Sequence, residues 1–95
     1  MKHDTAEIRR IARVVKQNAA AIHELESGTL QPLTRAVPQA LRGQAADALL
    51  TEITELATAM RRLGIDINGI GDELNSFARR LDIADQQAAD RIRSH

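Results

Sequence analysis

Apolar residues recur at intervals of three and four along most of the chain, the spacing that places them on one face of an α-helix. In the first segment this face is formed by Ile8, Ile11, Val15, Ile22 and Leu25. The preceding residues favour helix initiation, because Asp4 or Thr5 can cap the first turn and Glu7 stands three residues after Asp4. The pattern predicts a first helix that begins near residue 4 and extends to about residue 41.

Glycine and proline interrupt the second half of this first helix. Gly28, Pro32 and Pro38 each disfavour a continuous helix, an interior proline by about 3 kcal/mol. We therefore expect a kink or break near residues 28–32. Helical spacing persists beyond it in the apolar residues Leu30, Leu33, Val37 and Leu41. The chain is then expected to turn at about residues 41–44.

From Ala46 onward the apolar residues form a nearly unbroken heptad repeat, the pattern of helices that pack side by side. The a positions are Ala46, Ile53, Met60, Ile67, Leu74, Leu81 and Ala88. The d positions are Leu49, Leu56, Leu63, Ile70, Phe77 and Ala84. The repeat predicts a second helix over residues 45–92, about 70 Å long at about 1.5 Å per residue. A helix of that length needs lateral partners, because it cannot bury its apolar face on itself.

The middle e positions of the same repeat are all small, namely Ala57, Gly64, Gly71 and Ala78. A glycine inside a helix costs about 1 kcal/mol relative to alanine, so these glycines weaken the helix unless a neighbouring backbone approaches closely. The alternative is a hinge or loop across residues 64–71. Close packing is favoured, since the heptad repeat continues through the glycines without a shift.

Charge provides a separate test of how the two helices align. Lys plus Arg and Asp plus Glu each total 13, and this neutrality removes the basic surface expected of a nucleic-acid binder. Residues 1–43 carry a net charge of +3 and residues 44–95 a net charge of −3. An antiparallel arrangement about Gly43 therefore brings opposite charges together. The predicted neighbours are Glu24 and Glu26 with Arg61 and Arg62, and Arg13 with Asp72 and Glu73.

Candidate catalytic and metal-binding chemistry is sparse. The chain has no cysteine, and His3, His23 and His95 have no neighbours at metal-ligand spacing. The segment Gly69-Ile70-Gly71 is too short for a phosphate-binding fingerprint. We therefore expect a protein that is not an enzyme and needs no cofactor or metal.

Asn18 is the one polar residue in the middle of the apolar face of the first helix, between Ile11 and Leu25. A buried asparagine in a helical seam can specify the register of two helices. An asparagine at the edge of a wide face would simply be hydrated. The sequence leaves both interpretations open.

Two long helices joined at Leu41-Arg42-Gly43 resemble the WXG family, the small helical-hairpin substrates of bacterial type VII secretion. That family carries Trp-x-Gly at the turn and Tyr-x-x-x-Asp or Glu after the second helix as an export signal. Leu41 stands here at the tryptophan position with Gly43 retained, and Leu81 stands at the tyrosine position with Asp85 retained. The resemblance implies an all-α antiparallel hairpin that forms a four-helix bundle as a dimer, with Leu81 and Asp85 as a candidate export signal.

These observations predict a single domain over residues 1–95 that dimerises with itself, a related hairpin or an effector, with secretion machinery as a further partner. The start of the chain lacks the apolar stretch of a cleavable signal peptide, and no segment is apolar enough to enter a membrane. We expect secretion by another route, or a cytoplasmic protein before export. A generic coiled-coil assembly or chaperone-like subunit without a secretion role is the alternative. The predicted interface comprises Ile11, Val15, Ile22, Leu49, Ile53, Leu56, Met60, Leu63, Gly64, Ile67, Ile70, Gly71, Leu74 and Phe77.

Overall fold

A computed structural model describes residues 3–94, and helices account for nearly all of them. The elements are α1 (Thr5–Leu25), the π-helical turn η1 (Glu26–Leu30), α2 (Gln31–Ala40) and α3 (Gln44–Arg93). Residues 3–94 contain no strand, so the predicted all-α class is confirmed.

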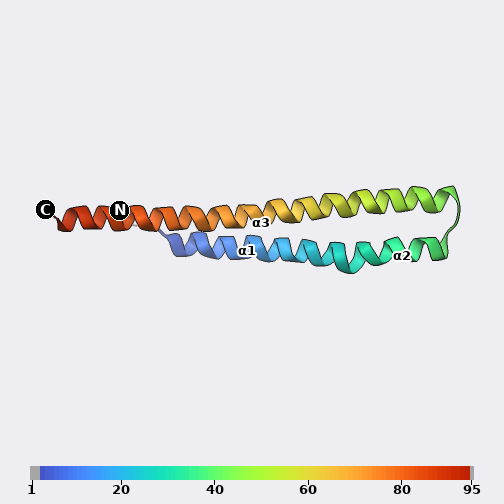
Figure 1. Ribbon diagram of the computed structural model, residues 1–95. Coiled ribbons are helices and arrows are strands. Elements are labelled where there is room, and N and C mark those ends of the chain that lie inside the picture. The colour runs from blue at the N-terminus through green and yellow to red at the C-terminus, as the bar shows by residue number, and fades with distance from the viewer. Residues whose placement is uncertain (1–2, 95) are drawn as a thin grey trace.

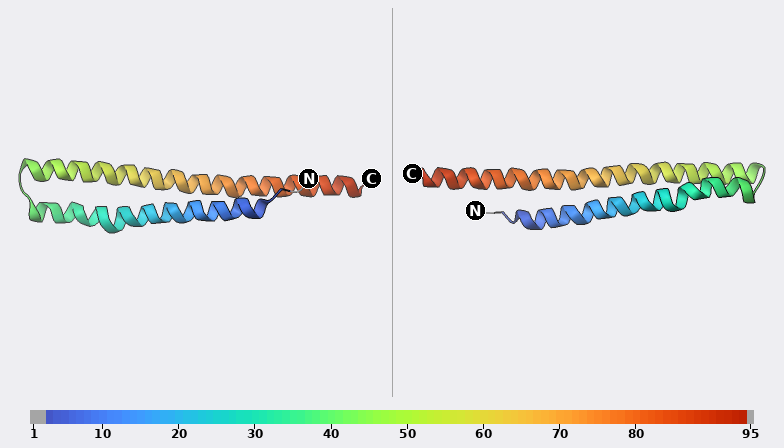
Figure 2. Two further views of the ribbon diagram at one scale, coloured as in Figure 1. Left: turned by 180° about the vertical axis from the view of Figure 1, so that it is seen from behind. Right: turned by 60° about the horizontal axis from the view of Figure 1, so that its bottom comes forward.

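The molecule is a thin rod in which α1, η1 and α2 lie along α3 and run in the opposite direction (Figures 1 and 2). Its principal extents are 79, 15 and 13 Å. A short connection at residues 41–43 reverses the chain at one end of the rod. At the other end α3 continues past the start of α1, so that both ends of the chain lie there (Figure 1).

Local sequence explains where the helices begin and reverse. Asp4 caps α1 as predicted, because its carboxylate accepts a hydrogen bond from the Glu7 backbone N–H at 3.2 Å. At the turn Leu41 is extended, and Gly43 has a φ of 76°, in the left-handed region that glycine adopts without strain. Gly43 therefore allows the chain to leave α2 and enter α3.

The interruption expected near residues 28–32 takes the form of the π-helical turn at Glu26–Leu30, and the chain stays helical through it. Pro32 follows in the first turn of α2, where a missing backbone N–H costs least. The extra residue of a π-helical turn shifts the facing of every later side chain around the helix axis. After it, Leu30 and Val37 take over the side of the helix that packs on α3.

The hydrophobic core lies at the turn end of the rod. It consists of Leu30, Val37, Ala46, Ile53 and Ala57, with Leu50 and Met60 packed against it. These side chains come from both sides of the reversal, so the turn end is held by ordinary packing of aliphatic side chains.

Toward the other end of the rod the contact between α1 and α3 is made by small residues. On α1 the deepest positions are Thr5, Ala12 and Ala19, and on α3 they include Gly71 and Ala78. α3 is unbroken through its glycines, so the hinge interpretation of residues 64–71 is wrong. A Cβ atom placed on Gly71 would lie 3.4 Å from the Ala12 carbonyl oxygen and closer still to Lys16 Cγ. The small residues therefore let the two backbones approach closely.

Candidate protein-interaction surface

Two rows of residues, seven apart, form the contact between α1 and α3. We call them the contact rows. One row consists of Thr5, Ala12 and Ala19 on α1 and Glu26 at the start of η1, and the other of Ala57, Gly64, Gly71 and Ala78 on α3. Positions on either side of these rows face opposite sides of the rod, because each residue turns a helix by about 100°. Because the two helices run in opposite directions, side chains that lie at the same angle from the contact row on α1 and on α3 are on the same side of the rod. The rod therefore has two distinguishable long sides.

One long side is polar and carries the ion pairs between the helices. Most of its residues stand four positions after a contact-row residue, as Arg9 follows Thr5 and Asp82 follows Ala78, and Asp72 stands one position after Gly71. Arg9 Nη2 lies 2.6 Å from Asp82 Oδ2, and Thr5 Oγ1 donates to Asp82 Oδ1 at 2.7 Å. Lys16 pairs with Asp72 on the same side. We call this the polar side.

The placement of Lys16 corrects one predicted ion pair. Arg13 was expected beside Asp72, but Lys16 is the partner of that carboxylate. On α1, Lys16 follows Ala12 by four residues and so lies about 40° from the contact row, whereas Arg13 follows Ala12 by one and lies about 100° from it. Lys16 is therefore closer to α3 and reaches Asp72.

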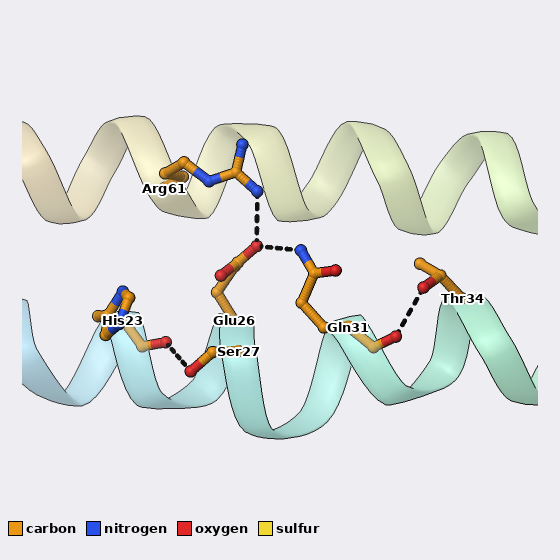
Figure 3. A network of polar contacts seen from close by, with 6 residues as sticks. All are labelled: His23, Glu26, Ser27, Gln31, Thr34 and Arg61. Carbon is orange, nitrogen blue, oxygen red and sulfur yellow. Dashed lines mark hydrogen bonds and ion pairs between the residues drawn. The ribbon is translucent and has the colours of Figure 1, made fainter.

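The predicted proximity of Glu26 and Arg61 is confirmed, and the structure adds a network around this pair (Figure 3). Glu26 is only 4% exposed, although it is a carboxylate. Its Oε1 accepts hydrogen bonds from Gln31 Nε2 at 2.7 Å and from Arg61 Nη2 at 2.8 Å. These two donors, Gln31 first, hold the pKa of Glu26 below its ordinary value. The π-helical turn places Glu26 and Gln31, five residues apart, on the side that faces α3.

The opposite long side of the rod is apolar and largely open. On α3 its residues stand one position before the contact row, as Phe77 precedes Ala78. They are half exposed: Leu56 52%, Leu63 50%, Ile70 54% and Phe77 47%, with Leu49 at 37%. We call Leu49, Leu56, Leu63, Ile70 and Phe77 the outer row. It runs about 42 Å along α3, at about 1.5 Å per residue.

α1 contributes to the same apolar side. Ile11 and Leu25 precede contact-row residues by one position and are 42% and 51% exposed, and Val14 beside them is 43% exposed. Asn18 holds the equivalent position before Ala19 and is exposed. Within a single chain, therefore, Asn18 is hydrated and does not fix the register of α1 on α3.

The residues predicted to form an interface divide into three groups by burial. Buried inside the chain are Ile53 and Gly71. Partly buried along the seam between the helices are Val15, Ile22, Met60, Gly64, Ile67 and Leu74. Exposed on the apolar side are Ile11, Leu49, Leu56, Leu63, Ile70 and Phe77. The sequence placed all of them on one broad surface, and the structure separates those that face α1 or α2 from those that face outward.

The residues of the turn and of the candidate export signal lie at opposite ends of the rod. Leu41 is 42% exposed and lies at the turn beside Gly43. Leu81 is partly buried in the seam. The Asp85 carboxylate binds His3, whose backbone N–H donates to Oδ2 at 3.0 Å and whose Nδ1 lies 2.9 Å from Oδ1. The backbone hydrogen bond from His3 is the main cause that lowers the pKa of Asp85.

The contact between His3 and Asp85 was not predicted, because 82 positions separate the two residues and no local pattern connects them. In residues 3–94, no group of three or more His, Cys, Asp or Glu side chains is placed to hold a metal ion. No helix in that range is both long and apolar enough to cross a membrane. No protein-family model, curated protein or solved structure matches this chain.

Proposed function

We propose that this protein is an antiparallel helical hairpin that works by pairing with a second helical chain through its apolar side. The observation that carries the proposal is the outer row of α3, which lies next to the exposed apolar residues of α1 on one side of the rod. A side of this kind is costly to leave in water and is typical of an interaction surface. Two hairpins joined by these sides would form a four-helix bundle.

The weak internal core of the single chain supports pairing. Among residues 3–94, no large side chain is fully buried. A two-helix chain of this size gains little stability from its own core, and such chains commonly rely on association. Pairing would cover the outer row and add the packing that one chain lacks.

We further propose that the pair is carried out of the cell by a type VII secretion system, with no catalytic role. The turn residues Leu41 and Gly43, and Leu81 with Asp85, support this by their likeness to the family's motifs. Both motifs lack the aromatic residue, so this chain would be the member of a pair whose partner supplies the intact signal.

A second candidate function is a coiled-coil assembly or chaperone-like subunit without a secretion role. Two observations favour it. Leu81 packs in the seam, and Asp85 is engaged by His3, so both residues of the candidate signal already have structural roles. The two candidates share the apolar side and differ only in what Asp85 does.

Association is tested by light scattering and circular dichroism on the purified chain at micromolar concentration. The proposal expects a dimer, or a poorly folded chain that becomes helical when a partner is added. A monomer that unfolds cooperatively at low micromolar concentration would contradict it.

Export is tested by assaying culture medium from cells that express the chain alone or together with a related hairpin. The proposal expects export that depends on the second hairpin. If the chain alone is exported and Asp85→Ala abolishes this, the chain carries its own signal. His3→Ala separates the two functions of Asp85, since it removes the ring contact but leaves the carboxylate. Asp47→Ala, at an exposed acidic residue of α3, is the matched control.

A further inference from the structure

We infer that the outer row of α3 binds α3 of a second copy of this chain, antiparallel, with a twofold axis between Leu63 and Ile70. This inference rests on the proposed pairing function and specifies its partner, surface and register. Three properties of the surface support it: its area, the order of its apolar residues and the order of its charges.

The exposed area is sufficient for a stable dimer. The chain has an accessible surface of 7139 Å² at a mass of 10.4 kDa. A globular monomer of that mass exposes about 5,400 Å², so the rod exposes about 1,700 Å² more. A stable protein–protein interface covers about 800 Å² on each partner. One long side of the rod can supply that area.

When the outer rows of two copies lie side by side in opposite directions, apolar residues of one row face apolar residues of the other. A twofold axis midway between Leu63 and Ile70 places Leu63 opposite Ile70 of the second copy, and Leu56 opposite Phe77. Leu49 then lies opposite Ala84. The Leu63–Ile70 and Leu56–Phe77 pairings each occur twice, because the contact is the same from both partners, and together they form four central layers of two large side chains each.

The charges beside the outer row match in the same register. Residues 44–60 contain Asp47, Glu52 and Glu55 and no Lys or Arg. Arg80 lies toward the other end of the row, three positions after Phe77. The axis brings Glu52 to within one residue of Arg80 of the second copy, and each of the two stands three positions after an outer-row residue, Leu49 and Phe77. A parallel arrangement would place acidic residues against acidic residues, which is unfavourable.

These charged side chains are available for a partner. Within residues 3–94, Glu52 forms no ion pair, and Arg80 lies over the Phe77 ring at 5.8 Å. One like-charge contact remains, since Asp66 meets Asp66 of the second copy near the axis. An unrelated helical partner would have no reason to match this chain's own reversed order of both charges and apolar residues. The observations therefore favour a second copy.

Cysteine cross-linking tests the register, and the absence of native cysteine makes it selective. Ala59→Cys and Glu73→Cys are prepared separately, mixed, and treated with a short bismaleimide. The inferred axis places position 59 opposite position 73, so the mixture should cross-link several times more than either variant alone. Thr58→Cys, mixed with Glu73→Cys, is the matched control because Thr58 is on the other side of α3. It should remain largely uncross-linked.

Light scattering on the same samples separates failure of the register from failure of the pairing. Dimers in which each variant cross-links mainly to itself would show a parallel contact and overturn this inference. Dimers without the 59–73 cross-link would place the contact on another surface and also overturn it. In both cases the proposed pairing function would stand. A monomer in all samples would overturn both.

A charge exchange tests the pairing of Glu52 with Arg80. Arg80→Glu replaces two attractions in the dimer by two repulsions, and we expect a dissociation constant roughly tenfold higher. Adding Glu52→Lys should restore the dimer. Arg80→Glu also removes the contact of Arg80 with the Phe77 ring, but Glu52→Lys does not replace that contact, so restoration would show that residues 52 and 80 meet. If the double variant is weaker than Arg80→Glu alone, these two residues do not meet and the register is wrong.

Discussion

The two ends of the rod hold the same helices together in different ways. At the turn end, Leu30, Val37 and Ile53 are buried between the helices as an aliphatic core. At the open end the contact is made by residues such as Ala12, Gly71 and Ala78. Close backbone approach there displaces the large side chains from the seam, so that Ile70 and Phe77 point outward. The turn end is therefore the main source of stability within the chain, whereas the exposed outer row runs along both parts of the rod.

The largest expected effect comes from truncating the turn-end core. Ile53 is 8% exposed, and Ile53→Ala should lower the free energy of unfolding by about 2–5 kcal/mol. Ile70 is 54% exposed, and Ile70→Ala should cost less than about 1 kcal/mol in a sample dilute enough to be monomeric. Urea unfolding followed by circular dichroism across a dilution series measures both. Equal costs for the two variants would break the contrast between the two ends.

Enlarging a residue of the close contact should have the next largest effect. Gly71→Leu should destabilise the chain by about 1–3 kcal/mol, because the added side chain meets Lys16 and the Ala12 backbone. Gly69 has no neighbouring atom within 4 Å of an added Cβ, so Gly69→Ala should stabilise α3 by up to about 1 kcal/mol. Thermal unfolding of the two variants compares them. An unchanged melting temperature for Gly71→Leu would show that the helices do not approach closely there.

Acid should weaken the rod through two carboxylates that accept hydrogen bonds, Glu26 and Asp85. The pKa values of Glu26 and Asp85 are lowered in the folded chain, so each contributes stability above its unfolded pKa. That contribution is lost as the pH falls from the ordinary carboxyl pKa of about 4 through the lowered folded value. Melting temperatures measured from neutral pH downward should therefore fall in this range. Glu26→Gln and Asp85→Asn should each flatten the decline, and an identical decline in both variants would assign it to other groups.

The smallest expected effect concerns the ion pairs of the polar side. Lys16→Gln should lower stability by a few tenths of a kcal/mol, because it removes an exposed pair with Asp72. Arg13→Gln is the matched control and should leave stability unchanged, since Arg13 faces away from α3. Urea titrations at low salt, where exposed pairs contribute most, compare the two variants. A larger loss for Arg13→Gln would mean that Arg13, as the charge pattern alone predicted, is the partner of Asp72.

Local patterns in the sequence determined the helices of this protein. The heptad repeat from Ala46 requires a long helix, Asp4 requires a helix start, and Gly43 permits a reversal, all through interactions between residues a few positions apart. The run of small e positions also predicted a close contact, because only a near neighbour compensates for glycine inside a helix.

Only the tertiary structure decided which side of each helix faces the other. From residue 46 to residue 84, positions a, d and e of α3 are all apolar or small, so the heptad repeat alone does not say which of them is covered. The structure buries the e row, since its small residues permit the closest approach of α1, and this leaves the d residues as the outer row. Likewise, the π-helical turn brings Gln31 to Glu26, and chain reversal brings His3 to Asp85. These outcomes depend on distances between segments remote in sequence, which no local pattern contains.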